Sequence, residues 1–139
     1  MNDRIFVDTN ILVYCFDDAN PAKKKKAIKI MEDLWETSRG VLILQVLKEF
    51  FVTVTVKLPD KMDFRDAKGA VLDLLSWNIF NESRSSLEMT FEIIQKYHLS
   101  LWDANILSAA ILSDCQKVYS EDLQHNQTIE GAQVINPFL

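Results

Sequence analysis

A short apolar stretch that ends on an acid and runs straight into a helix-like pattern constrains the fold most. Residues 5–7 are Ile, Phe and Val, followed by Asp8, and this pattern predicts a buried strand over residues 5–8. Asn10 is a favourable helix N-cap, and residues 11–14 continue as apolar residues that begin a helix. In an open parallel sheet, ligands bind outside the carboxyl ends of the strands. Asp8 is therefore expected at the edge where such folds build active sites.

Size and composition predict a single domain over residues 1–139 with a substantial core. Only three Gly and three Pro argue against an all-β fold and favour helices. The net charge of −5 gives no chain-wide nucleic-acid signature, because typical binders are basic, but it permits a local cluster of acids. Cys15 and Cys115 lack metal-ligand spacing and are expected to be reduced core residues. With no membrane-span or signal-peptide pattern, we expect a cytoplasmic protein that does not contact membranes.

Strand-like and helix-like segments alternate along the rest of the chain. A helix is predicted after Asn20 and Pro21, ending at Gly40, with later helices starting near Asp63, at a Ser85–Glu88 capping box and at Ser100. The helix that starts at the Ser85–Glu88 capping box carries Leu87, Phe91, Ile94 and His98 on one stripe, which predicts its buried face. Further strands are predicted over residues 41–44, 77–80, 116–119 and 133–135, the last at an edge. This alternation predicts a three-layer α/β/α fold with a mainly parallel central sheet of four to five strands.

Residues 45–56 are ambiguous between strand and helix. Residues 51–56 alternate and are β-branched, which favours a strand. However, the segment follows a predicted strand without a hairpin turn, and a parallel sheet needs a crossover there. We therefore predict a helix, which places Glu49 on one face with Gln45, Val46, Val52 and Thr53.

Four acids fall at strand ends or in the first turns of helices: Asp8, Glu49, Asp103 and Asp122. Each has a structural alternative, since Asp8 and Asp122 suit turns, Asp103 suits a capping box and Glu49 suits a solvated helix face. If the four converge, they need a cation, because clustered carboxylates cannot all stay ionised alone. Mg²⁺ prefers oxygen ligands, and it is commonly held by one or two carboxylates while further acids act through bound water.

Lys23, Lys24, Lys25 and Lys26 form a basic run over the first turns of the helix that follows Pro21. A run of this kind is most simply a solvated helix face. The alternative is a patch that contacts RNA phosphates at the mouth of a nucleic-acid groove.

Four segments, in order along the chain, resemble the acidic motifs of PIN-domain proteins. Residues 7–14 (VDTNILVY) resemble the opening motif, and residues 45–50 (QVLKEF) resemble the second. Residues 101–110 (LWDANILSAA) and 118–123 (VYSEDL) resemble the third and fourth. Residues 134–138 (VINPF) are similar to the tail of bacterial members. The resemblance thus covers the whole chain, and it supports a helix over the second segment.

This resemblance implies a ribonuclease that depends on Mg²⁺ or Mn²⁺, and its short single-domain members are typically VapC-like toxins of type II toxin–antitoxin pairs. It implies an RNA substrate, a small cognate antitoxin protein and a homodimer. Asp8, Glu49, Asp103 and Asp122 would be the metal-site acids, and Thr9, Asn10 and Ser120 would orient carboxylates and metal-bound waters. Glu121 would assist beside Asp122, and Asn126 stands where similar sequences often have Gly.

Other functions remain open from the residues alone. A metal-independent ribonuclease would use His98 and His125 as acid and base. An aspartyl-phosphate hydrolase would also place an Asp after the first strand, but it usually has a second acid two residues later, where this chain has Asn10. The last alternative is a catalytically inactive PIN-like module that binds RNA or protein.

Overall fold

A six-stranded sheet forms the centre of the computed structural model, which describes residues 3–139. The strand order is β3-β2-β1-β4-β6-β5, and every neighbouring pair is parallel except β5 with β6. The mainly parallel sheet confirms the predicted fold class, with one or two strands more than expected. The strands are β1 (Ile5–Val7), β2 (Gly40–Leu42), β3 (Asn78–Ile79), β4 (Lys117–Tyr119), β5 (Thr128–Ile129) and β6 (Ala132–Ile135).

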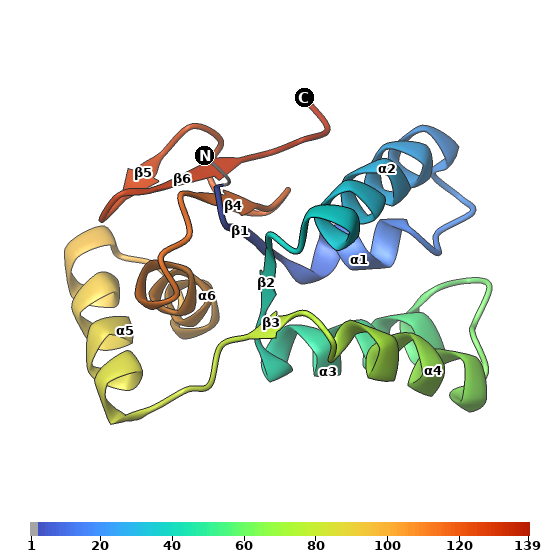
Figure 1. The fold of residues 1–139 in the computed structure, drawn as a ribbon, viewed down its shortest axis with the longest axis horizontal. Coiled ribbons are helices and arrows are strands. Elements are labelled where there is room, and N and C mark those ends of the chain that lie inside the picture. Colours follow the sequence, from blue (N-terminus) through green and yellow to red (C-terminus); the bar gives the residue numbers. More distant parts are fainter. Residues whose placement is uncertain (1–2) are drawn as a thin grey trace.

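Helices cover both faces of this sheet, which gives the three layers that the sequence predicts. Figure 1 shows α5 and α6 on one side of the strands, and α1 to α4 on the other. The helices are α1 (Thr9–Tyr14), α2 (Pro21–Thr37), α3 (Leu44–Val52), η1 (Thr53–Lys57), α4 (Phe64–Leu74), α5 (Arg84–Tyr97) and α6 (Leu101–Leu112). No described helix is long and apolar enough to cross a membrane.

The central strands β1 and β4 bring two distant parts of the chain to the same edge of the sheet. They pair in parallel, with Val7 opposite Tyr119, so both end at the same level. The backbone N–H of Asp8 donates to the carbonyl of Tyr119 at 3.0 Å, which extends the pairing by one residue. Asp8 and Ser120, the residues that directly follow the two strands, therefore lie together.

The core explains why these elements form. All three residues of β1 and of β2 are buried, as expected for central parallel strands. Helix α6 is buried over most of its length, with Leu107 and Ala110 fully enclosed, and the small Ala residues allow close packing against α5 and the sheet. Cys115 is buried and Cys15 is half-buried, and both are free thiols, as predicted.

The ambiguous segment after β2 is helical, which confirms the prediction made from topology over the one made from β-propensity. Helix α3 continues into η1, a single π-helical stretch over the β-branched residues. The Thr55 hydroxyl donates to the Phe51 carbonyl at 2.7 Å, so the helix accommodates this β-branched residue with its polar atom satisfied.

Two predicted helix boundaries are wrong. Asp8 caps α1, because its carboxylate accepts from the Thr9 N–H, and Asn10 already lies inside the helix. Helix α2 ends at Thr37, and its C-cap Ser38 adopts a left-handed conformation with φ of 57°. Gly40 begins β2, where the Trp77 indole lies so close that a Cβ atom would overlap it.

The start of α5 and its buried face also differ from the prediction. Ser83 caps the helix in a reciprocal box with Ser86, because the Ser86 hydroxyl takes the part that the sequence assigned to Glu88. The face toward α6 consists of Ser86, Thr90 and Ile93. The predicted stripe lies one position further along, and its members Leu87 and Phe91 are exposed, while His98 caps the helix C-terminus. Because most of the buried face is polar, the spacing of apolar residues predicted the wrong face of the helix.

The last strand is not an edge strand. Strand β6 lies between β4 and the short β5, which pairs with it antiparallel through a tight turn at Glu130 and Gly131. Both turn residues have positive φ, 47° and 89°, as a two-residue hairpin of type I′ requires. Gly131 is the only turn-forming residue type in this hairpin, and β5 has only two residues. The sequence pattern therefore did not predict the strand.

Candidate active site

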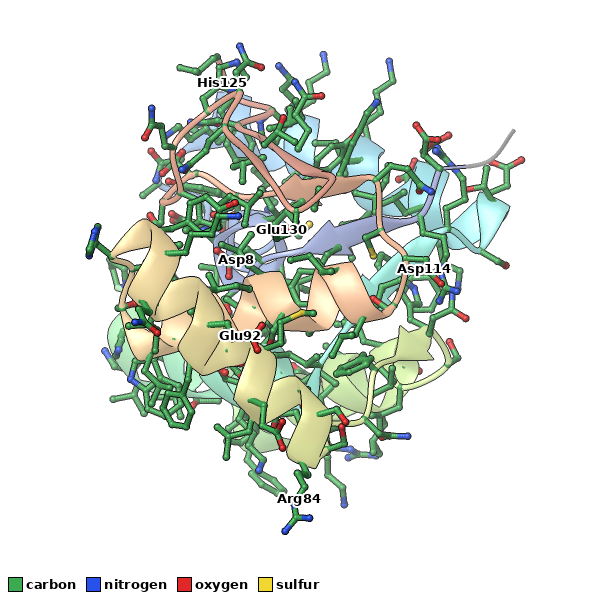
Figure 2. All side chains as sticks on the ribbon, turned by 90° about the vertical axis from the view of Figure 1, so that its left-hand side faces the viewer. Asp8, Arg84, Glu92, Asp114, His125 and Glu130 are labelled. Carbon is green, nitrogen blue, oxygen red and sulfur yellow. The ribbon has the colours of Figure 1, made fainter. Side chains whose placement is uncertain are left out.

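Asp8 is the buried centre of the site at the carboxyl ends of β1 and β4. Its side chain is 5% exposed, and three donors hold it. The Thr9 N–H donates to Oδ1 at 2.7 Å, and the Ser120 hydroxyl donates to Oδ2 at 2.7 Å. The Asn10 amide reaches Oδ2 at 3.3 Å. Figure 2 shows Asp8 in the interior, at the level of the strand ends beside α6. The carboxylate is fixed in position before any ligand arrives.

Ser120 fixes the loop that follows β4. Its side chain is fully buried, and its oxygen accepts from the backbone N–H groups of Asp122 and Leu123 at 3.2 and 3.3 Å. Since the same hydroxyl donates to Asp8, one residue couples the conformation of the loop to the carboxylate. Ser120 therefore contacts Asp8 directly, and its role in orienting the carboxylate for a metal stays a prediction.

Asn10 links the first acid to the fourth. Its Nδ2 lies 3.3 Å from Oδ2 of Asp8 and 3.1 Å from Oδ2 of Asp122. Its Oδ1 accepts from the Glu121 N–H at 3.1 Å, which fixes the amide orientation. Two carboxylate oxygens from residues more than a hundred positions apart are thus within hydrogen-bonding distance of one nitrogen. Sequence reasoning identified Asn10 as an orienting residue, and the structure gives it this geometry.

Glu49 reaches the same place from α3. The Thr9 hydroxyl donates to its Oε2 at 3.3 Å, and the Gln45 amide donates to its Oε1 at 2.7 Å. Thr9 therefore contacts both Asp8, through its backbone, and Glu49, through its side chain.

Burial raises the pKa of Asp8 from 3.8 to about 6. Hydrogen bonds from Ser120 and Thr9 favour the charged form, but the negative charges of Asp122 and Glu49 oppose it. Two like charges act on this buried carboxylate, so a cation between these acids would relieve a real electrostatic cost.

Asp103 lies in the first turn of α6, as predicted, and its backbone N–H donates to the Ser100 hydroxyl at 3.1 Å. In the part of the chain that the structure describes, no hydrogen bond links its side chain to Asp8, Glu49 or Asp122. Nor do any three His, Cys, Asp or Glu residues among residues 3–139 lie close enough to hold an ion jointly. The structure thus connects three of the four predicted acids and leaves Asp103 apart from the network.

Glu121 is occupied by a separate set of contacts. The Tyr14 hydroxyl donates to one of its oxygens at 2.6 Å, and Lys23 pairs with the other at 2.7 Å. Burial works against the charged form, but the hydrogen bonds from Lys23 and Tyr14 outweigh it and lower the pKa of Glu121. Both oxygens are engaged, so Glu121 fixes the loop beside Asp122 from the outside.

The lysine run divides into two pairs. Lys23 binds Glu121, and its Nζ also lies 4.9 Å from the centre of the Tyr14 ring. Lys24 pairs with Asp18. Lys25 and Lys26 are exposed, and these two are the residues of the predicted RNA-contact run that face solvent.

Sequence reasoning missed a polar connection that leads away from Glu49. The Asn105 amide of α6 donates to Gln45 at 2.7 Å and to Glu82, in the loop before α5, at 2.6 Å. Gln45 was noted only as a neighbour of Glu49 on the helix face. A polar Asn within the mostly apolar α6 was the signal in the sequence that could have pointed to this connection.

The two histidines do not form a pair. His98 caps α5, and His125 accepts from the Asn136 N–H at 2.9 Å through Nδ1. Figure 2 shows His125 on an outer loop, well separated from Asp8. This arrangement gives no support to an acid–base pair of histidines.

The available donors fit a hard divalent cation. The residues that meet here offer carboxylate oxygens, and Asp8 and Asp122 share the Asn10 nitrogen. Mg²⁺ sites commonly use one or two carboxylates and fill the remaining positions with water. The Asp8–Asp122 pair meets that requirement without a third direct ligand.

Comparisons with known proteins agree with this architecture. A toxin–antitoxin complex from Klebsiella pneumoniae contains a chain with a TM-score of 0.71 and 24% identity, over 96% of this chain and 97% of that one. VapC20 of Mycobacterium tuberculosis, described as a toxin that cleaves the sarcin-ricin loop, has a TM-score of 0.63 and 20% identity, over 85% and 89%. No curated protein sequence matches. The family model of the PIN domain matches residues 5–130, a range that contains all four predicted acids. This chain therefore belongs to the PIN domain family.

Proposed function

We propose that this chain is an endoribonuclease that depends on Mg²⁺ or Mn²⁺ and hydrolyses RNA phosphodiester bonds with an activated water. The observation that carries this proposal is the link from Asp8 through Asn10 to Asp122 at the carboxyl end of the parallel strands. Membership of the PIN domain family supports a nuclease, and the RNA-cleaving toxin among the similar structures supports RNA as the substrate.

Asp8 and Asp122 are the acids we assign to direct contact with the ion, and Glu49 and Asp103 complete the site through bound water. A bound divalent ion supplies a water nucleophile at neutral pH and neutralises charge on the scissile phosphate. Thr9 and Ser120 hold the Asp8 carboxylate in its orientation and favour its ionised form. Lys25 and Lys26, which are exposed, are the candidates for contact with RNA phosphates.

A chelation experiment tests the chemistry. Purified protein incubated with a mixed-sequence RNA should cleave it in Mg²⁺ or Mn²⁺, lose the activity in excess EDTA and regain it when the ion is restored. Cleavage that survives complete chelation would contradict the proposed mechanism, because that mechanism needs a bound divalent ion.

The biological role that we propose is the toxin of a type II toxin–antitoxin pair, which acts in the cytoplasm with a small antitoxin protein as partner. The similar chain from a toxin–antitoxin complex supports this role. Expression of the chain alone should arrest bacterial growth, and co-expression of the small protein encoded beside it should restore growth. Normal growth with abundant folded protein would exclude the toxin role and leave the nuclease chemistry intact.

We also propose a homodimer. Large apolar side chains on the neighbouring helices α3 and α4 support it, namely Val52, Phe64 and Leu72, which are 45%, 66% and 53% exposed. Light scattering on the purified protein should give twice the mass of the 16.0 kDa chain.

A further inference from the structure

Glu49 differs from Asp8 in how its carboxylate is held. It lies on an exposed position of α3, and a long exposed side chain samples many rotamers unless neighbours restrict it. Here both oxygens have a donor, Thr9 on Oε2 and Gln45 on Oε1. The Gln45 contact is the shorter, at 2.7 Å against 3.3 Å, so Gln45 provides the stronger restraint.

Gln45 can donate to Glu49 only in one of its two amide orientations. Its Oε1 accepts from Nδ2 of Asn105 at 2.7 Å, which turns its NH₂ group toward Glu49. If the amide were flipped, its NH₂ would face the NH₂ of Asn105 and its oxygen would face a carboxylate, so two hydrogen bonds would become repulsive contacts.

The orientation of Asn105 is fixed in turn. Its Nδ2 also faces Oε1 of Glu82 at 2.6 Å, and an ionised carboxylate only accepts. Its Oδ1 lies 3.4 Å from the hydroxyl of Thr90, but that hydroxyl is closer to the Ser86 carbonyl, at 2.9 Å, so the Glu82 carboxylate provides the restraint. The direction of hydrogen bonding therefore runs from Glu82 through Asn105 and Gln45 to Glu49.

We propose that Gln45 and Asn105 are positioning residues that hold the Glu49 carboxylate toward Asp8 for divalent-ion binding. Asn105 sets the amide orientation of Gln45, and Gln45 sets the carboxylate orientation of Glu49. This inference rests on the metal site of the proposed function. It adds two residues from outside the acidic set and predicts that they act in series.

Manganese binding by the full-length protein tests the proposal without relying on activity. Free Mn²⁺ is measured by electron paramagnetic resonance for the wild type, Gln45→Met and Asn105→Leu. Methionine keeps the length of glutamine and removes the amide. Loss of a partner that orients a direct ligand typically weakens metal binding 10- to 100-fold. Because Glu49 acts through bound water, a loss at the lower end of that range, about tenfold, is expected for Gln45→Met, and a loss no larger for Asn105→Leu. Gln95→Met, the same change at an exposed position of α5, should leave binding unchanged. Thermal melting in EDTA checks that each variant is folded.

The double variant separates positioning in series from general loosening of the fold. If Asn105 acts through Gln45, the double variant binds Mn²⁺ as weakly as Gln45→Met alone, whereas independent effects multiply. Saturating Mn²⁺ should also restore the RNA cleavage rate of both single variants. Multiplied losses, or wild-type affinity in Gln45→Met while Asp8→Asn abolishes binding, would overturn this inference alone. Absence of Mn²⁺ binding by the wild type would overturn the metal site as well.

Discussion

Asp8 meets two opposing requirements at the scale of a single residue. As the cap of α1 and the partner of Ser120, it is built into the fold, and its oxygens are well supplied with donors. As a buried acid near Asp122 and Glu49, it is costly to ionise, and its pKa rises to about 6. A residue that only capped a helix would not need these acidic neighbours, so this cost supports the metal site that we propose.

Asp8→Asn should stabilise the metal-free protein at pH 7. A shift from 3.8 to about 6 corresponds to about 3 kcal/mol, at about 1.4 kcal/mol per pKa unit. Asn still caps a helix, but its NH₂ cannot accept from Ser120, so we expect a net gain of about 1–2 kcal/mol. Urea denaturation in EDTA measures the gain.

The same variant has a defined pH dependence. The native state binds the Asp8 proton more tightly than the unfolded state, so this residue destabilises the fold as the pH rises from about 4 through 6. The advantage of Asp8→Asn should therefore be largest at pH 7 and shrink or reverse near pH 4. An advantage that does not change with pH would show that Asp8 titrates normally.

Ser120→Ala should destabilise the protein, whereas Asp8→Asn should stabilise it. The hydroxyl bonds the charged carboxylate and two backbone N–H groups inside the protein, so its loss leaves buried groups without partners. We expect a destabilisation of about 2–3 kcal/mol at pH 7. The loss should be smaller at pH 4, where Asp8 is neutral, and denaturation at the two pH values measures the difference. Wild-type stability at both would argue against the coupling of loop and carboxylate.

At the scale of elements, apolar patterns predicted the buried strands well. They failed where a buried face is polar and is held by hydrogen bonds. The strand at residues 5–7 and the helical crossover over residues 44–52 follow from hydrophobicity and topology. The buried face of α5 did not, because Ser86 and Thr90 satisfy each other and α6 through hydrogen bonds. Strand β5 exists only because β6 pairs with it, which a local pattern cannot show.

Two glycines give a matched test of the packing between elements. In Gly40→Ala the new Cβ overlaps the Trp77 indole, which packs edge-on against Trp35 at 5.7 Å, so the element must shift. We expect a loss of about 1–3 kcal/mol. Gly69→Ala in α4 meets open space and should gain up to about 1 kcal/mol. Thermal melts of the two variants should move in opposite directions; equal shifts would mean that the Gly40 contact is not tight.

At the scale of the whole molecule, the sequence predicted that four acids would meet at the sheet edge with Thr9 and Asn10 beside them, but not the contacts made by side chains outside that set. Parallel strands that end at one level place Asp8 beside Ser120, and Asn10 then joins Asp8 to Asp122. The contacts of Gln45 with Asn105, and of Lys23 with Glu121, join elements far apart in sequence, and their side chains carry no periodic signal. Asp103 stays a predicted member of the site, since it lies in the first turn of α6 and, in residues 3–139, no hydrogen bond joins its side chain to the other acids.

The most direct test of the account compares RNA cleavage by the wild type, Asp8→Asn and Asp114→Asn in Mg²⁺. Asp114 is an exposed acid after α6 with φ of 59°, which Asn tolerates, and Figure 2 shows it apart from Asp8. We expect Asp8→Asn to remain folded and to lose at least about a hundredfold in cleavage rate, while Asp114→Asn cleaves like the wild type. Equal cleavage by Asp8→Asn and the wild type would contradict the assignment of the active site.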